Sequence, residues 1–351
     1  MNTIGSILGA IVLCCATGGT GTVSAAASSP TPDHATTMGY EDGPSGARPL
    51  VWVRYDAAAD SAALVVGDVH GRWQRQLTHP VPGIRDSEPV RSPDGTRVAF
   101  NREHPDGTVE IGIVNVRGGP VRFVETGCQD PCFTDQGPGW TPDGNHLTFV
   151  RVSGPFDPVT GDAAAALQYT ERLDGTHLRL LSVPGDYEDN GVRFAPDGTF
   201  LVFIRDQRVD GVLHFAIFRM RPDSTHVRQL TPWDLDADRA SVSPARSGPT
   251  AGLISFETHG GGYATQGDVA LLPSSCATLA ECTAATRYVT HNAGTPRTSY
   301  AASWSPTGRR LAFAQEDGTG NVDVFTVRPD GRDQRQVTRS PVPEYSPAWS
   351  Q

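Results

Sequence analysis

The sequence predicts an all-β protein, a six-bladed β-propeller of four-stranded blades. Three observations predict this fold. A Pro-Asp-Gly turn motif returns along the chain, a second motif built on arginine follows it, and the segments between the two alternate apolar and polar residues. A repeat of about 50 residues is typical of propellers and other repeat architectures. Each repeat would build one blade of four strands.

The first motif is a tight turn followed by a strand. Its copies begin at Ser92, Thr141, Ala195 and Ser305, with a degenerate copy at Ser243. Proline presets the second position of the turn, aspartate suits the third, and glycine takes the left-handed conformation that side chains resist. After the first turn, Val98 and Phe100 alternate with smaller or polar residues, which is the period of a β-strand.

The second motif closes each unit with an arginine two places before Leu or Val. Its six copies begin at Arg75, Arg122, Arg179, Arg228, Arg287 and Arg335. Six closing motifs predict six units. Further β-rich segments lie between the two motifs, such as 109–116 and 321–328, so each unit offers four short strands.

The two ends of the chain hold complementary parts of one unit. Residues 345–351 resemble an opening strand without the outer strands that should follow, whereas 49–55, 62–69 and 74–78 lack an opening strand. We therefore expect a composite blade in which a C-terminal inner strand joins N-terminal outer strands. Such a blade closes the ring and leaves no open edge.

The repeat pattern, apolar-Ser-Pro-Asp-Gly-x-x-apolar-x-Phe, resembles the WD40-like repeats of the TolB family, which are periplasmic six-bladed propellers. The resemblance covers roughly residues 49 to 351. It implies that the stretches at Trp140, Trp304 and Trp349 are innermost strands. It also implies a protein- or peptide-binding role. The separate N-terminal domain of that family is not expected here, because only a linker precedes the predicted blades.

The N-terminal segment is predicted to direct export. Residues 1–27 carry no charge, 4–12 form a short apolar core, and small residues near 23–27 offer a cleavage site. Lipidation of Cys15 is the alternative. Residues 28–47 lack periodicity and are predicted to be a flexible linker. The propeller would then occupy 48–351 of a secreted protein, extracellular or periplasmic.

Four cysteines remain after the predicted signal peptide. Export exposes them to an oxidising compartment, which favours disulfides. Three pairings of four cysteines exist. Nearness in sequence favours Cys128 with Cys132 and Cys276 with Cys282. A metal site is the alternative, but the spacing lacks the CxxC pairs and paired histidines of zinc sites.

Charge excludes several classes of partner. The formal net charge is −10, with 29 basic residues, all arginine, against 39 acidic ones. An acidic surface repels phosphate backbones and anionic lipid heads, so we expect neither nucleic-acid nor membrane-surface binding. No apolar run after residue 27 is long enough to span a membrane. We expect a monomer.

Two short motifs imitate enzyme signatures. Residues 67–71 match the first motif of metallophosphoesterases, and 259–263 imitate the oxyanion loop of esterases. The first lacks the order and the helices of that family, and the second lacks the G-x-S-x-G elbow anywhere in the chain. We therefore predict no catalytic residue.

Acidic residues recur at one position, seven places before each turn proline or before Gln351. This position holds Asp86, Asp135, Asp189, Ala237, Ser299 and Glu344, and the next holds Ser87, Gln136, Asn190, Asp238, Tyr300 and Tyr345. Both positions precede the innermost strands, so we expect them to meet at one mouth of the central channel. The predicted binding residues are Asp86, Asp135, Gln136, Asp189, Asn190, Asp238, Tyr300, Glu344 and Tyr345. Clustered carboxylates attract cations or basic peptides, and tyrosine is favoured at recognition surfaces.

The sequence therefore predicts a non-catalytic module that binds a protein or peptide, for example of the cell envelope, through this acidic mouth. The alternative is a hydrolase or lactonase that holds Ca²⁺ in the same ring, because Ca²⁺ needs several oxygen ligands. No general base stands out, so the enzyme is the second hypothesis. A scaffold with an idle channel is the third, since fold alone does not fix function. No cofactor is predicted.

Overall fold

The computed structural model describes residues 49–156, 163–182, 185, 187–209, 212–259 and 267–349. The predicted signal peptide (1–27) and linker (28–47) lie outside the described residues, as does most of the glycine-rich segment at 259–263. Strands dominate the described part. Its two helical segments are α1 (Leu279–Ala285) and the short 3-10 helix η1 (Trp233–Leu235).

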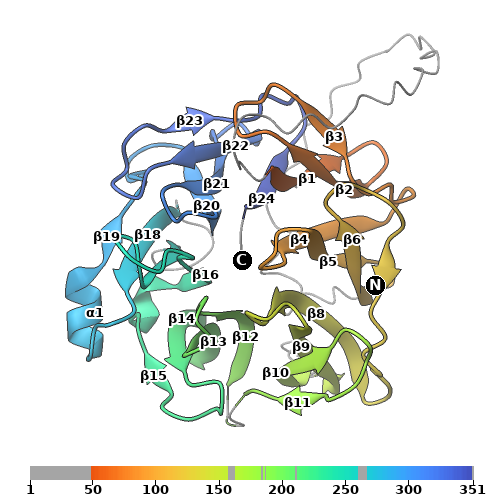
Figure 1. The fold of residues 1–351 in the computed structure, drawn as a ribbon, viewed down its shortest axis with the longest axis horizontal. Coiled ribbons are helices and arrows are strands. Elements are labelled where there is room, and N and C mark those ends of the chain that lie inside the picture. Colours follow the sequence, from red (N-terminus) through yellow and green to blue (C-terminus); the bar gives the residue numbers. More distant parts are fainter. Residues whose placement is uncertain are drawn as a thin grey trace.

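The described strands form six groups of four around a common centre (Figure 1). The first regular group contains β4 (Arg85–Arg91), β5 (Arg97–Glu103), β6 (Val109–Asn115) and β7 (Arg122–Phe123). The second contains β8 (Cys132–Trp140), β9 (His146–Phe156), β10 (Ala163–Arg172) and β11 (Arg179–Leu180). The third contains β12 (Glu188–Phe194), β13 (Leu201–Val209), β14 (Val212–Met220) and β15 (Arg228–Gln229).

The remaining regular groups follow the same order. One contains β16 (Ala237–Val242), β17 (Leu253–Thr258), β18 (Asp268–Pro273) and β19 (Arg287–Tyr288). The other contains β20 (Thr298–Trp304), β21 (Leu311–Glu316), β22 (Val322–Val327) and β23 (Arg335–Gln336). The all-β propeller predicted from the repeats is confirmed, and the grouping agrees with six blades.

The sixth group joins the two ends of the described chain. Strand β24 (Glu344–Ala348) pairs antiparallel with β1 (Leu50–Asp56), which pairs with β2 (Ser61–Gly67), which pairs with β3 (Gln74–Gln76). The composite blade expected from the sequence is therefore present. A parallel contact between Ala62 and Arg85 also links β2 to β4, so this blade continues into the next sheet.

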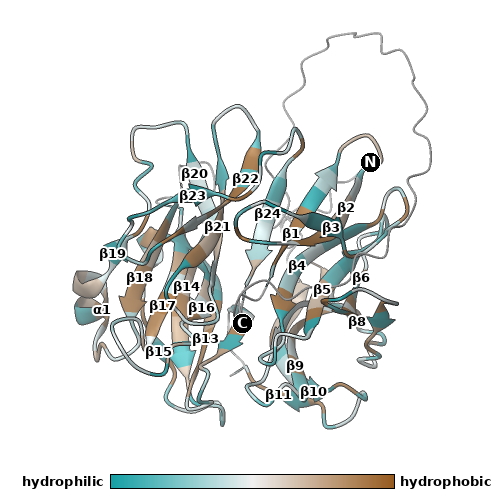
Figure 2. Cartoon of the chain, turned by 45° about the horizontal axis from the view of Figure 1, so that its top comes forward, coloured by the Kyte–Doolittle hydropathy of each residue, from teal (hydrophilic) through white to brown (hydrophobic). Residues whose placement is uncertain are grey.

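Apolar side chains fill the space between neighbouring blades. Figure 2 shows hydrophobic residues along strands such as β18. Trp140 and Trp304 are fully buried, and their indole N–H groups donate to the carbonyls of Val90 (3.0 Å) and Ser241 (3.2 Å) on the preceding inner strands. These tryptophans therefore join one blade to the previous one through both packing and a hydrogen bond.

Arg91 is the polar exception at the position that Trp140 occupies in its repeat. The side chain is 1% exposed, and its guanidinium donates to the carbonyls of Pro49 and Gly95. Pro49 precedes β1, so Arg91 links the first regular blade to the composite blade. Backbone oxygens thus accept hydrogen bonds from both terminal nitrogens of the buried guanidinium, which offsets part of the cost of burying its charge.

The disulfides pair as expected, Cys128 with Cys132 and Cys276 with Cys282, with Cα–Cα distances of 5.3 and 5.2 Å. None of the helices in the described ranges has the length and apolar character needed to cross a membrane.

Trp349 provides a test of the ring closure. It is 6% exposed and packs against Leu50 and Trp52 of the composite blade. We expect Trp349→Ala to lower the free energy of unfolding by about 3–5 kcal/mol, because it leaves a cavity in this core. Trp73, which is 42% exposed, offers the matched control, and Trp73→Ala should change stability by no more than about 0.5 kcal/mol. Equal effects in urea unfolding would contradict closure by this segment.

Candidate functional site

A buried ion pair links the inner strand to the second strand within several blades. The Asp86 oxygens accept from Arg102 Nε (2.7 Å) and Nη2 (2.9 Å), and the pairs Asp135–Arg151 and Asp189–Arg205 repeat this fork. Each of the three pairs spans 16 residues. Glu344 forms the corresponding pair with Arg54 at 2.6 Å in the composite blade. All four acids are at most 4% exposed.

The predicted acidic ring is therefore engaged in ion pairs inside the blades instead of facing the channel mouth. Two-point contacts of this kind bind a carboxylate strongly, and the arginine charge balances the carboxylate charge. Asp86, Asp135, Asp189 and Glu344 are absent from the wall of the central cavity, as are Tyr300 and Tyr345. In the blade of β20, a hydrogen bond from Gln315 Nε2 to Ser299 Oγ (2.9 Å) takes the place of the ion pair. The recurrent acids thus connect strands inside the blades.

In each inner strand, the residue two places after the recurrent acidic position adopts the left-handed backbone conformation. The six residues are Glu88, Gly137, Gly191, Arg239, Ala301 and Ser346, with φ between 47° and 66°. A register shift in the strand pairing accompanies each, which marks a β-bulge. The left-handed conformation costs free energy for any residue that has a side chain. Its recurrence at non-glycine positions is therefore typical of a functional site.

All six bulge residues line one central cavity of about 730 Å³, a volume that suits a ligand. Of the predicted binding residues, Gln136, Asn190 and Asp238 lie on its wall. Sequence reasoning missed Glu88 and Arg239, which occupy the bulge position. Glycine at that position in two repeats, Gly137 and Gly191, was the available signal.

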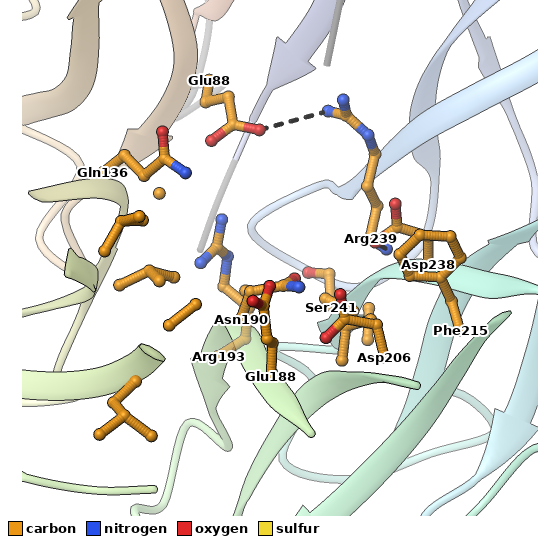
Figure 3. A pocket seen from close by; sticks show the side chains of 18 of the residues that line it. Glu88, Gln136, Glu188, Asn190, Arg193, Asp206, Phe215, Asp238, Arg239 and Ser241 are labelled. Carbon is orange, nitrogen blue, oxygen red and sulfur yellow. Dashed lines mark hydrogen bonds and ion pairs between the residues drawn. The ribbon is translucent and has the colours of Figure 1, made fainter. Parts of the chain in front are cut away.

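Glu88 and Arg239 face each other across the cavity. They lie on β4 and β16, whose blades are separated by two blades in each direction around the ring, and their side chains approach to 4.0 Å (Figure 3). Asn101 Nδ2 donates to Glu88 (3.1 Å), and Arg239 Nε lies 3.3 Å from Glu257 Oε1. The charged pair therefore bridges opposite walls.

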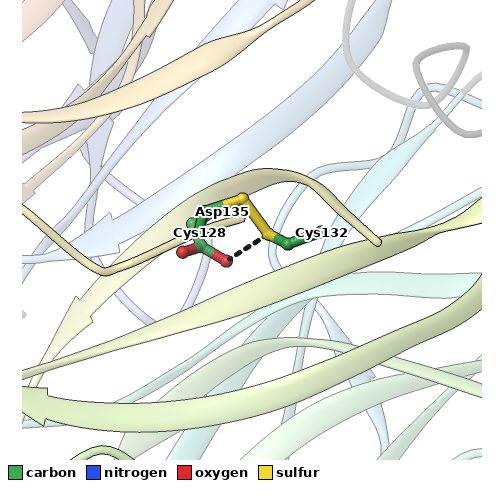
Figure 4. A group of neighbouring side chains, drawn as sticks. All are labelled: Cys128, Cys132 and Asp135. Carbon is green, nitrogen blue, oxygen red and sulfur yellow. Dashed lines mark hydrogen bonds between the residues drawn. A yellow bond between two sulfur atoms is a disulfide. The ribbon is translucent and has the colours of Figure 1, made fainter. Parts of the chain in front are cut away.

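Within the described part of the chain, two groups of side chains have the composition of metal ligands. Asp238, Glu257 and His259 place donor atoms within 4.8 Å of one another, and so do Cys128, Cys132 and Asp135. The second group is a disulfide beside a carboxylate (Figure 4), so its sulfurs are not thiolates. Only the first group offers ligands in a usable chemical form.

Electrostatics in the first group follow from burial and from Arg239. Burial and the neighbouring Glu257 charge raise the pKa of Asp238. Burial opposes ionisation of Glu257 as well, but Arg239 and the His259 contact at 3.1 Å outweigh it and lower the Glu257 pKa. Burial would lower the His259 pKa, and the bond to Glu257 reverses this, so the pKa is raised. The cluster therefore favours an imidazolium–carboxylate pair.

A second carboxyl group on the wall lacks any such partner. Asp206 of β13 lies opposite Glu188 of β12, is 7% exposed, and its Oδ1 has no hydrogen-bond partner among the described residues. Burial, followed by the Glu188 charge, raises the pKa of Asp206 to about 8. Asp206 thus holds a proton at neutral pH. No repeated pattern in the sequence singled it out.

Arg193 brings positive charge to the same cavity wall. Its Nη1 donates to the carbonyl of Val192 at 2.9 Å. Burial lowers the pKa of Arg193, although Glu88 partly opposes this shift. The wall therefore carries separated charges of both signs.

Comparison with known proteins finds similarity in structure. No protein-family profile matches the chain, and no curated protein matches it in sequence. TolB from Acinetobacter baumannii superposes with a TM-score of 0.64 at 17% identity, over 87% of this chain and 67% of that one. Putative TolB from Agrobacterium tumefaciens gives 0.56 at 18% identity, over 84% and 90%. The chain has a TolB-like β-propeller fold.

An enzyme shares this TolB-like fold. An oligogalacturonate lyase in complex with manganese superposes with a TM-score of 0.50 at 16% identity, over 84% of this chain and 73% of that one. Identities this low establish the fold alone, because one fold serves several functions.

The raised pKa of Asp206 predicts a pH-dependent stability. The folded chain keeps this proton up to about pH 8, whereas the unfolded chain releases it near 3.8, so rising pH favours unfolding between these values. We expect Asp206→Asn to gain stability relative to the wild type by about 1.4 kcal/mol per pH unit within this window. Denaturant unfolding at pH 5 and 7.5 measures the difference.

Asp94→Asn is the matched control for this experiment. Burial opposes the shift at Asp94, but hydrogen bonds from Ser92 and Thr96 outweigh it and lower the pKa to about 2. Asp94 therefore titrates below the tested range, and its difference from the wild type should be the same at both pH values. The same constancy in Asp206→Asn would contradict a protonated Asp206.

Proposed function

We propose that this protein is an exported, non-catalytic TolB-like propeller that binds a protein or peptide segment in its central cavity. The observation that carries the proposal is the ring of bulges, because six left-handed residues at equivalent positions turn toward one cavity. A bulge on an inner strand redirects side chains and is common beside binding sites. The two disulfides support an oxidising location outside the cytoplasm.

The cavity wall differs in kind from the blade interiors. Inside the blades, Asp86, Asp135 and Asp189 each have an arginine at 2.7 Å, whereas Glu88 and Arg239 approach only to 4.0 Å. Glu88 also accepts from Asn101, and Arg239 also lies near Glu257, so a ligand would share these side chains with their partners in the protein. The proposed contacts are therefore Gln136, Asn190 and Asp238 from the predicted set, together with Glu88 and Arg239. The buried acids Asp86, Asp135, Asp189 and Glu344 position the strands that carry them.

Gln136 allows a direct test of the cavity. It lies on the cavity wall, on the inner strand next to the one that carries Asn190 (Figure 3), so Gln136→Trp should fill part of the space. Peptides selected from a random display library on the wild-type protein should bind Gln136→Trp at least tenfold more weakly in calorimetry. Gln74→Trp makes the same substitution on exposed β3 and should bind normally. Equal affinity of the selected peptides for both variants would contradict binding in the cavity.

A metal-dependent hydrolase or lactonase is the second candidate function. The specific observation in its favour is the group of Asp238, Glu257 and His259, whose oxygen and nitrogen donors suit a divalent ion. The acids first expected to hold Ca²⁺ are paired with arginine instead. Arg239 also lies 3.3 Å from Glu257, and a cation would have to displace it. The geometry therefore favours the binding module.

Metal titration separates the two candidate functions. We expect Ca²⁺ and Mn²⁺ to bind the wild-type protein weakly, because the Arg239 charge repels a cation at this cluster. Arg239→Ala should bind Mn²⁺ at least tenfold more tightly by calorimetry. Arg246 does not line the cavity, so Arg246→Ala is the control and should change nothing. A stoichiometric, tightly held ion in the wild-type protein would favour the hydrolase.

A further inference from the structure

We propose that Arg193 anchors a carboxylate of the peptide ligand, supplied either by the C-terminus of the peptide or by an acidic side chain. This inference rests on the proposed binding of a peptide in the central cavity, and it adds the chemical group that the cavity recognises. Arg193 lies on the inner strand β12 and lines the cavity.

Arg193 departs from the repeat at its own position, three places before the turn proline. The equivalent residues of the other inner strands, matched by the strand pairing, are Val90, Gly139, Ser241, Ser303 and Ala348. These five residues are small or apolar. The propeller therefore does not need a charge here, and a reason for the arginine has to be sought outside the repeat.

The neighbouring inner strand, β8, leaves room for this long side chain by carrying glycine. A Cβ atom on Gly139 would lie 3.1 Å from Arg193 Nη1 and 2.7 Å from the Val192 carbonyl oxygen, to which that nitrogen donates. Any larger residue at position 139 would therefore crowd the guanidinium. Glycine on one strand and arginine on the next are thus matched departures from the repeat, and together they hold the guanidinium against the adjacent blade.

The protein supplies little compensation for the Arg193 charge. The hydrogen bond to Val192, at 2.9 Å, is the only one that its guanidinium makes among the described residues, and no described carboxylate lies within 4.0 Å of it. Burial lowers the Arg193 pKa, and Glu88 only partly opposes this shift. Glu88 itself accepts from Asn101 and approaches Arg239. The guanidinium thus remains charged, partly desolvated and with further N–H donors to offer.

A carboxylate is the group that such an arginine binds best. The planar guanidinium presents parallel N–H donors that match the two carboxylate oxygens, and the opposite charges strengthen both hydrogen bonds. In Figure 3 the Arg193 guanidinium points from β12 into the cavity, toward the side on which Gln136 and Glu88 lie. A ligand in the cavity would therefore meet it.

The remaining charges make this a short-range contact. The formal net charge of −10 gives the protein no long-range attraction for an anion. Asp206, on the same wall, keeps its proton at neutral pH, so its carboxyl group does not repel a carboxylate. Recognition of the anion therefore depends on direct hydrogen bonding to Arg193.

The experiment uses peptides selected on the full-length wild-type protein from a library displayed with free C-termini. In each selected peptide the carboxylates are neutralised one at a time, by amidating the C-terminus or by exchanging aspartate for asparagine and glutamate for glutamine. One of these changes should weaken binding at least tenfold in calorimetry, because it removes the partner of Arg193. The change that does so identifies the source of the carboxylate.

Three protein variants complete the test. Arg193→Gln should weaken the unmodified peptide at least tenfold and bind it and its neutralised form equally. Arg193→Lys keeps the charge and should recover part of this loss. Arg208→Gln is the matched control, because it removes a positive charge from the same cavity wall and should preserve the difference between the two peptides. Far-UV circular dichroism and urea unfolding confirm that the variants fold.

The outcomes distinguish this inference from the proposed function. Peptides that distinguish wild type from Gln136→Trp, but tolerate neutralisation of every carboxylate or bind Arg193→Gln equally, would leave the peptide-binding cavity standing and overturn the carboxylate anchor. Loss of the peptide difference in Arg208→Gln as well would assign it to the overall charge of the cavity and also overturn the anchor. Failure to obtain any peptide that distinguishes wild type from Gln136→Trp would overturn both proposals.

Discussion

The pairing of β24 with β1 joins the two ends of the described chain and closes the ring of blades. The rest of the structure depends on this contact, because each blade buries its apolar faces only when neighbours stand on both sides. Trp349 on one end packs against Leu50 and Trp52 on the other, so closure is sealed by a hydrophobic core as well as by backbone hydrogen bonds. A closed ring also fixes the width of the central cavity, which then has six walls of similar construction.

Inside the blades, charge has a structural use. Asp86, Asp135 and Asp189 are buried away from water. Two-point contacts with arginine offset the desolvation cost of their carboxylates. Burial of both charges is costly, and only good geometry with several hydrogen bonds offsets it. Such pairs specify the register of inner and second strands, since removing either partner would leave a buried charge alone. Their recurrence in several blades explains why acids return at one sequence position.

At the cavity wall the repeat loses its symmetry. The bulge position keeps its backbone conformation in all six inner strands, but it carries glutamate in one, arginine in another and small residues in the rest. Glu88 and Arg239 are consequently paired with each other across the ring, and Asp206 Oδ1 meets no donor among the residues that the structure describes. Other buried polar atoms without a partner in the described ranges, such as Trp52 Nε1 and Glu344 Oε2, belong to residues away from the cavity wall.

The sequence by itself determined the fold. The Pro-Asp-Gly turns, the closing arginine motifs and the incomplete units at the two ends predicted the propeller and its composite blade, and neighbouring cysteines predicted both disulfides, because these features depend on local geometry. The sequence also located the inner strands, and Gln136, Asn190 and Asp238 proved to line the cavity. Only the tertiary structure decided which partner each acid meets. Asp86 and its counterparts pair with arginines 16 residues away, whereas Glu88 meets Arg239 across the ring, and the burial of Asp206 depends on three strands. Such distances and burial exist only once the ring has closed, and no local pattern encodes them.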